Sequence, residues 1–203
     1  MCPNSTAPMK PQTDTNRRIG MAQESIAVTA ADPDAQRSAL ETLLEEYHAW
    51  LASEAREWAA EQESTTAALP EEGYDPTTGA AEDIETLADP GSDVRGFLAS
   101  YEGEAAGVVL LCGVSEGMAE LKRLYVRPTC REHGIGRALC RAAIEAADER
   151  GYGTVGLTTP PWSEGAHALY EDLEFAYADP YPETKLPEHL HEDALFMQRD
   201  LSS

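Results

Sequence analysis

Apolar and polar residues change their period along this chain in an order that predicts a mixed α/β domain. The stretch ESIAVTAAD alternates through Ile26 and Val28, as expected of a first strand that ends near Asp32. Residues 32–62 then carry apolar side chains at helical spacing, which predicts one amphipathic helix or two consecutive helices. Asp32 before Pro33 is expected to cap this helix. The apolar positions are Leu40, Leu43, Leu44, Tyr47, Trp50, Leu51 and Trp58.

The middle of the chain predicts a loop and then a meander of strands. Residues 63–93 mix Pro, Gly, Thr and Glu, so we expect a long acidic loop with at most one helical turn. Loops of this length inside a domain are usually functional or mobile. Three strands are then expected at 97–101, 106–114 and 118–126, joined by the turns EGE and SEG.

After Pro128 the apolar positions take up helical spacing, and Gly151 is a good stop signal for that helix. A short strand at 152–161, a short helix opened by Ser163 and an alternating strand at 193–201 complete the pattern. This order predicts an α/β domain with a mixed, largely antiparallel sheet and one βαβ unit. The stripe of the helix after Pro128 consists of Ile135, Leu139, Ala142, Ala143 and Ala146.

The length of 203 residues suits a single domain, since domains commonly hold roughly 100–200 residues. Residues 1–24 are rich in Pro, Thr, Asn and Gln and predict a disordered tail, which leaves 25–203 as the domain; Met21 is an alternative start. No apolar run reaches the roughly 18 residues of a membrane span, and the first residues lack the apolar core of a signal peptide. We therefore expect a soluble, cytoplasmic protein that does not bind membranes.

The charge balance excludes one class of partner. The chain has 37 acidic and 15 basic residues, for a net charge of −22, which repels nucleic acid and anionic lipid. Lysine is scarce, with only Lys10, Lys122 and Lys185. This composition suits a cytoplasm with molar salt, so a halophilic source is one hypothesis, which unfolding at low salt would support. The alternative is that the acidity attracts a cationic amine.

The cysteines give no sign of a metal centre. Cys2, Cys112, Cys130 and Cys140 form no CxxC and no paired spacing with histidine, which argues against a zinc site and a disulfide framework. We expect free thiols and no metal.

Candidate chemistry begins at the mouth of the helix after Pro128, where Gly134 and Gly136 lie one residue apart. A helix N-terminus presents unpaired N–H groups and partial positive charge, and glycine lets an anion approach them closely. Arginines at 123, 127, 131 and 137 add local positive charge in an acidic chain. The third glycine of a Rossmann motif and the Lys-Ser/Thr of a P-loop are missing. The residues expected around a diphosphate are Arg131, Gly134, Ile135, Gly136, Arg137 and Ala138.

Together with its flanks, ELKRLYVRPTCREHGIGRAL and AHALYEDLEF, this turn resembles the GNAT superfamily of N-acetyltransferases. The family signature Arg/Gln-x-x-Gly-x-Gly/Ala reads REHGIG at residues 131–136, and the resemblance extends from about residue 26 to residue 201. It implies that acetyl-CoA binds in a V-shaped gap between two splayed parallel strands. The residues that it implies for the cofactor are Leu124, Tyr125, Val126, Arg131, His133, Gly134, Ile135, Gly136, Arg137, Ala138 and Ser163.

The resemblance also implies two catalytic residues. A neutral amine must attack the thioester, so one group has to remove a proton and another has to protonate the departing thiolate. Tyr170 matches the tyrosine that commonly supplies this acid in the family, and a phenol with an ordinary pKa of ~10 is protonated at neutral pH. Glu120 matches a glutamate often used as general base. The alternatives are that Tyr170 only packs in its helix and that Glu120 only pairs with Arg123.

Two positions depart from the family pattern. Ser163 stands where the family often has asparagine, three residues before Ala166, so one contact to the CoA arm is replaced or lost. Glu174 stands where glycine is usual, before Phe175, which changes a turn and no identifiable chemistry.

The resemblance implies an acetyl-CoA-dependent N-acetyltransferase that acts on a primary amine of a small molecule or peptide by direct attack, without a metal. A homodimer is expected from family habit. One rival is a non-catalytic CoA-binding sensor or partner subunit, which needs the glycines but not Tyr170; another is an enzyme for longer acyl groups. The segments expected to select the acceptor are the helical region around Tyr47, Trp50 and Trp58, the loop around Tyr74, and residues 179–191.

Overall fold

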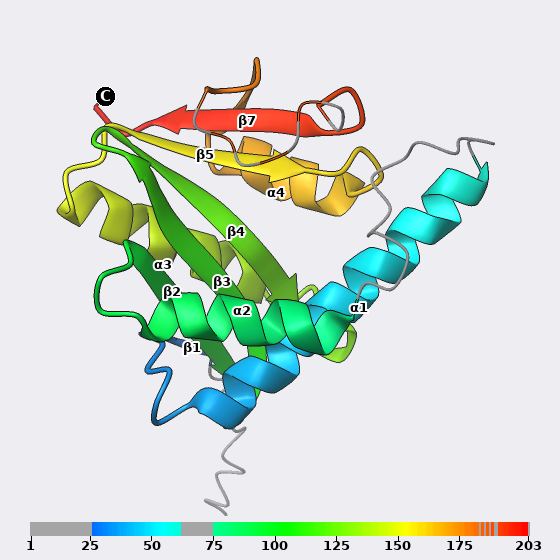
Figure 1. The fold of residues 1–203 in the computed structure, drawn as a ribbon, viewed down its shortest axis with the longest axis vertical. Helices are drawn as coiled ribbons and strands as arrows, with labels where there is room; N and C mark the ends of the chain where they lie inside the picture. The colour runs from blue at the N-terminus through cyan, green and yellow to red at the C-terminus, as the bar shows by residue number, and fades with distance from the viewer. Residues whose placement is uncertain are drawn as a thin grey trace, which may run out of the picture.

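A computed structural model describes residues 26–61, 75–182, 184, 186, 188 and 191–202 (Figure 1). The expected tail at 1–24, the alternative start Met21 and the loop around Tyr74 lie outside the described residues. The elements are β1 Ile26–Ala30, α1 Arg37–Glu61, α2 Pro76–Ala88, β2 Val94–Tyr101, β3 Glu104–Ser115, β4 Met118–Val126, a 3-10 turn Pro128–Cys130, α3 Ile135–Glu149, β5 Thr154–Thr159, α4 Glu164–Asp172, β6 Ala176–Ala178 and β7 Leu195–Asp200.

The strands form one sheet in the order β1-β2-β3-β4-β5-β7-β6, in which every pair is antiparallel except β4–β5. Helices cover both faces (Figure 1): α1 and α2 lie on one, and α3 and α4 pack on the other. Side chains of β3 alternate accordingly, since Val109 belongs to the core on the α3 side and Val108 and Leu110 to the core under α1 and α2. The predicted mixed, largely antiparallel sheet with one βαβ unit is confirmed.

Two predictions about residues 32–93 were wrong. Of the two helical alternatives, the single helix is present as α1, but it begins at Arg37 and Asp32 is not its N-cap, because Asp32 accepts hydrogen bonds from the N–H groups of Asp34 and Ala35 and so caps a turn that precedes the helix. The predicted acidic loop contains the 13-residue helix α2. The Asp75 side chain caps this helix, and its apolar positions recur at helical spacing. They are Ala80, Ile84 and Leu87, all buried.

Strand β4 contains a bulge that the sequence did not reveal. Val108 and Leu110, two residues apart on β3, pair with Tyr125 and Lys122, three residues apart on β4. Arg123 lies in this step with φ of 57°, in the left-handed region that most residues avoid. Residues three apart on a regular strand point to opposite faces, whereas here both point to the face of α1 and α2. The bulge therefore concentrates side chains of β4 on that face.

Strands β4 and β5 separate along their length. They pair from Met118–Thr154 to Leu121–Leu157, and beyond this point β4 stays paired only with β3 while β5 continues with β7. Figure 1 shows the two strands diverging toward the end of β4 that leads into α3. The V-shaped gap implied by the family resemblance is therefore present in the fold.

Candidate active site

The N-terminus of α3 has free N–H groups and lies near the open end of the gap between β4 and β5. Helical hydrogen bonding begins with the N–H of Ala138, which donates to the carbonyl of Gly134 at 3.0 Å, so the N–H groups of residues 135–137 have no partner within the helix. Gly134 has φ of 82°, and a Cβ there would meet nothing within 4 Å. Glycine at 134 therefore serves the backbone conformation, and the room that it leaves for an anion stays a prediction.

At Gly136 the absence of a side chain matters because other side chains lie close to this position. A Cβ on Gly136 would lie 3.3 Å from Cδ2 of Leu169 and 3.8 Å from Cγ2 of Val126. These two residues belong to α4 and to the end of β4, the elements that border the open end of the gap. The missing side chain keeps this entrance open.

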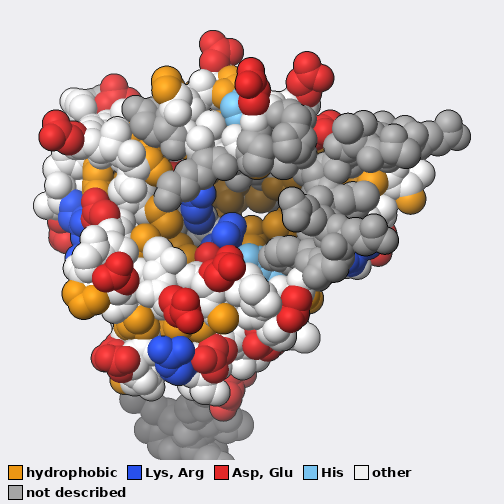
Figure 2. All heavy atoms as spheres, in the orientation of Figure 1, with side chains coloured by type: hydrophobic (Ala, Val, Ile, Leu, Met, Phe, Trp, Pro, Cys, Tyr) orange, Lys and Arg blue, Asp and Glu red, His pale blue; other side chains and the backbone are white. Residues whose placement is uncertain are grey.

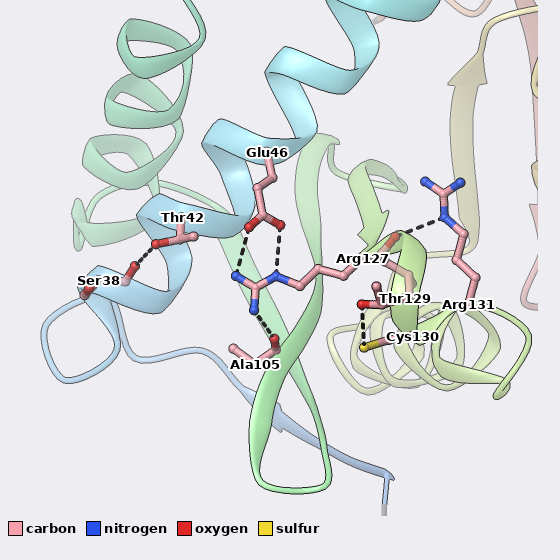
Figure 3. A network of polar contacts seen from close by, with 9 residues as sticks. Ser38, Thr42, Glu46, Ala105, Arg127, Thr129, Cys130 and Arg131 are labelled. Atoms are coloured by element: carbon pink, nitrogen blue, oxygen red, sulfur yellow. Dashed lines mark hydrogen bonds and ion pairs between the residues drawn. The ribbon is translucent and has the colours of Figure 1, made fainter.

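Three of the four arginines that form the predicted local excess of positive charge are paired with carboxylates. Arg123 bonds Asp83 at 2.7 Å and Arg137 bonds Asp172 at 2.6 Å. Arg127 makes two hydrogen bonds to Glu46, at 2.9 and 3.0 Å (Figure 3). Their charge is therefore largely neutralised, and the predicted local excess is smaller than the sequence suggests.

Arg131 is the arginine of this group that has no carboxylate partner in the described part of the chain. Its Nε donates to the carbonyl of Val126 at 3.2 Å (Figure 3), and its guanidinium lies 5.7 Å from the ring centroid of Trp50. His133 bonds the carbonyl of Arg131 at 2.7 Å and packs on Tyr101. These contacts hold the loop before α3 beside the end of β4.

The edge of β4 that faces β5 has no strand partner from Lys122 onward, and it includes the expected pantetheine-binding residues Leu124, Tyr125 and Val126, of which the carbonyl of Val126 accepts from Arg131. The Tyr125 ring is buried and packs 6.5 Å from Tyr47 and 6.3 Å from Trp50, centroid to centroid. Ser163 occupies the N-cap position of α4, but its side chain makes no capping hydrogen bond. An extended ligand could use this strand edge as a further strand does.

Tyr170 lies on α4, buried and 5.9 Å from the ring of Phe175. Burial, followed by the neighbouring Cys140, raises the pKa of its phenol above the usual value. No hydrogen bond joins its hydroxyl to another described residue. Tyr170 is therefore protonated at neutral pH, with its proton available to a ligand.

Glu120 is almost fully buried, at 2% exposed. The hydroxyl of Tyr181 donates to Oε1 at 2.6 Å, and Nζ of Lys122 lies 3.0 Å from Oε2, without the geometry of a hydrogen bond. The alternative prediction that Glu120 pairs with Arg123 was wrong, because Arg123 turns to Asp83. The sequence placed Tyr181 in an acceptor-selecting segment but gave no sign that it contacts Glu120.

A second polar cluster lies on the same face. Asp83 on α2 accepts from Arg123 and lies 2.8 Å from Nε2 of His48, which is buried on α1. Burial raises the pKa of Asp83, but the hydrogen bonds from His48 and Arg123 outweigh it and hold the pKa below its usual value. The guanidinium of Arg123 also lies over the ring of Tyr47. Sequence reasoning missed Asp83 because it assigned the residue to a loop.

Figure 2 shows the face of α1 and α2 hollowed near its centre, with Lys, Arg and hydrophobic side chains deeper than the acidic side chains around them. The ring of Trp58 on α1 lies 5.1 Å from the ring of Trp162, which precedes α4. A separate cavity of about 620 Å³ lies at the far end of β3. There Asp93 is already bound by Arg150 and Tyr152, so its carboxylate is occupied.

Two further features bear on the class of protein. Among the residues that the structure describes, no three His, Cys, Asp or Glu side chains are grouped to hold a metal ion. None of the described helices is long and apolar enough to cross a membrane.

Comparison with known proteins identifies the class that this fold and site define. The model of the acetyltransferase (GNAT) family matches residues 52–175, which is more than half of the chain. The chain therefore belongs to the acetyltransferase (GNAT) family.

Relatives by sequence include the uncharacterized N-acetyltransferase YjgM of Escherichia coli, 34% identical over 86 residues, which are 41% of this chain and 52% of that protein. The IAA acetyltransferase of Azospirillum brasilense is 33% identical over 49% of this chain and 64% of its own length. The chain thus matches about half to two thirds of the length of these curated relatives.

Among solved structures, the PaiA N-acetyltransferase of Thermoplasma acidophilum in complex with coenzyme A superposes with a TM-score of 0.59. The alignment covers 87% of this chain and 99% of that one at 16% identity, so it shows a shared fold.

Proposed function

We propose that this protein is an N-acetyltransferase that transfers the acetyl group of acetyl-CoA to a primary amine of a small molecule or peptide. The observation that carries the proposal is the gap between β4 and β5, which opens after Leu121 and Leu157. Its flanking elements carry Tyr170 and Glu120, and its open end meets the free N–H groups of α3. Membership of the acetyltransferase family and the N-acetyltransferases among its relatives support the assignment.

The residues present suit acetyl-CoA. The N–H groups of residues 135–137 and the guanidinium of Arg131 would bind the diphosphate, and Gly136 leaves room beside it. The unpaired edge of β4 at Leu124–Val126 would accept the pantetheine arm, whose amides alternate donors and acceptors as a strand does. When bound, acetyl-CoA supplies an acetyl group activated as a thioester.

The proposed reaction assigns one proton to each catalytic residue. Glu120 accepts a proton from the acceptor ammonium, directly or through a water, so that a neutral amine attacks the thioester carbonyl. A C–N bond forms and the C–S bond breaks, and the Tyr170 hydroxyl donates its proton to the departing thiolate. The second proton, which the nitrogen loses as the amide forms, returns to the Tyr170 phenolate directly or through water. Tyr170 is buried and protonated, so it suits the role of proton donor. Glu120 is buried and already accepts one hydrogen bond, so it suits the role of proton acceptor.

The acceptor is expected on the face of α1 and α2, where Glu120 points. Charges on this face come largely in opposed pairs, Arg123 with Asp83 and Lys122 with Glu120, and aromatic rings line it. An amine with an apolar or aromatic portion fits these surroundings better than a polycation. Nucleic acid and membranes are not proposed as partners, given the net charge of −22.

The test is calorimetric titration with acetyl-CoA in molar KCl, followed by a thiol-release assay over a panel of primary amines. Tyr170→Phe is expected to lower kcat by at least about tenfold with little change in acetyl-CoA affinity, since general acid catalysis commonly contributes ~100-fold or more. Tyr177→Phe, at an exposed tyrosine on β6, is the matched control. A folded protein that does not bind acetyl-CoA would overturn the proposal. Binding with no turnover on any amine would favour the sensor, whereas full activity of Tyr170→Phe would overturn the role of Tyr170 as the general acid.

A further inference from the structure

The carboxylate of Glu120 is held from outside its own strand, by a residue of the segment between β6 and β7. We propose that Tyr181 is a positioning residue for the transfer reaction, which fixes Glu120 so that its second oxygen faces the acceptor amine. The inference rests on the proposed function and adds a residue that the reaction depends on.

The two oxygens of Glu120 have different surroundings. Oε1 accepts the hydroxyl of Tyr181 at 2.6 Å, a short charge-assisted hydrogen bond. Oε2 is buried and makes no hydrogen bond, and the Lys122 ammonium beside it at 3.0 Å lies outside hydrogen-bond geometry. One oxygen is thus occupied and oriented, while the other can accept a proton. Without Tyr181, rotation of the carboxylate would interchange the two.

The position of the Tyr181 ring is built into the sheet. Gly156 on β5 is the residue paired with Glu120 across the parallel strands, so its missing side chain leaves space directly beside Glu120. The ring of Tyr181 fills this space: a Cβ on Gly156 would lie 3.1 Å from Cε1 of Tyr181 and would also meet Met118. Phe196 of β7 packs edge-on against the ring at 5.8 Å. Both residues of the bond are at least 95% buried, with Tyr181 at 5% and Glu120 at 2% exposed.

A purely structural role would make Glu120 an acceptor for a buried hydroxyl and a counter-ion for Lys122, whose side chain is 27% exposed and can be hydrated without it. That explanation is weak, because an ionised carboxylate costs several kcal/mol to bury. A backbone carbonyl or a neutral side chain would satisfy the hydroxyl at much lower cost. The arrangement makes more sense when the carboxylate is the group required and Tyr181 is its support.

The experiment is a double-mutant cycle on kcat with the full-length protein, using Tyr181→Phe, Glu120→Gln and the double variant. Tyr181→Phe is expected to lower kcat at least tenfold while the dissociation constant of acetyl-CoA stays within twofold. In the Glu120→Gln background the same change is expected to alter kcat less than twofold, because the hydroxyl acts through the carboxylate. Tyr177→Phe serves as the control for removal of a nearby, exposed hydroxyl.

Gly156→Ala gives a second route to the same bond if Tyr181→Phe fails to fold. Its Cβ would push the end of the Met118 side chain aside and shift the Tyr181 ring by a few tenths of an ångström while both partners are kept, so kcat is expected to fall in the wild-type background and to stay unchanged in Glu120→Gln. Equal losses in both backgrounds, or an unchanged kcat in Tyr181→Phe, would overturn the positioning role alone. A folded wild-type protein without turnover on any amine would overturn the proposed function and this inference together.

Discussion

Gly136 offers the sharpest test of the cofactor site, because the structure separates its effect on folding from its effect on binding. It is the second residue of α3, where alanine is intrinsically better than glycine by up to about 1 kcal/mol. Against this gain, the new Cβ would lie 3.3 Å from Cδ2 of Leu169, the end of a flexible side chain that can shift by a few tenths of an ångström. We therefore expect Gly136→Ala to change the free energy of unfolding by less than about 1 kcal/mol, or about 2–4 °C in Tm.

Binding should respond much more. The added methyl group lies between Leu169 and Val126, at the entrance through which the pantetheine arm would pass beside the N–H groups of α3. Loss of one hydrogen bond to a charged phosphate oxygen removes about 1.5–3 kcal/mol. Since 1.4 kcal/mol corresponds to tenfold in affinity, the dissociation constant of acetyl-CoA should rise at least about tenfold. Gly136→Val should abolish measurable binding.

Gly165 provides a matched control, because it is the second residue of α4 and a Cβ there would meet nothing within 4 Å. Gly165→Ala should show a similar or larger gain in stability with unchanged affinity. Isothermal titration calorimetry and thermal unfolding of the three proteins measure both quantities. If Gly136→Ala binds acetyl-CoA as tightly as wild type, the entrance assigned to the cofactor is wrong.

Three other outcomes are expected. Asp83→Ala should cost about 3 kcal/mol in urea unfolding, since it breaks a buried ionic cluster, whereas Glu46→Ala at a half-exposed pair should cost less than about 1 kcal/mol. Folding lowers the pKa of Asp83, so its contribution to the free energy of unfolding is present above the ordinary pKa of 3.8 and is lost as the pH falls below that value. The difference in stability between wild type and Asp83→Ala should therefore narrow in acid. A difference that does not change with pH would contradict the assignment. Burial raises the pKa of Cys140 to about 12, so iodoacetamide at pH 8 should alkylate half-buried Cys130 before Cys140, as read by peptide mass spectrometry. If the halophilic hypothesis holds, molar KCl should raise Tm markedly over dilute buffer; equal Tm values would refute it.

Local signals in the sequence located most of the sheet and the entrance of the site. Hydrophobic periodicity, turn residues and a glycine stop predicted strands at 97–101, 106–114 and 118–126 and a helix that ends at Gly151, which correspond to β2, β3, β4 and α3. The glycines at the start of α3 could be linked to an anion site because helix termini have the same free N–H groups in any fold. Helix α2 was missed, although Asp75, Pro76 and an apolar repeat signalled it, because threonine and glycine dominate its first turn.

The tertiary structure alone decided which charged groups meet. Arg123, Arg127 and Arg137 find carboxylates 40, 81 and 35 residues away, and Glu120 finds Tyr181 61 residues away. Such pairs depend on how helices and strands pack, and an arginine carries the same charge in sequence whether it is free or paired. The bulge at Arg123 is likewise a feature that only the tertiary structure decides, since strand register is set by the neighbouring strand. The sequence by itself thus determined most helices and strands and the type of ligand that the N-terminus of α3 suits, because both depend on residues close together in the sequence. The environment of each catalytic candidate was decided by contacts between distant parts of the chain.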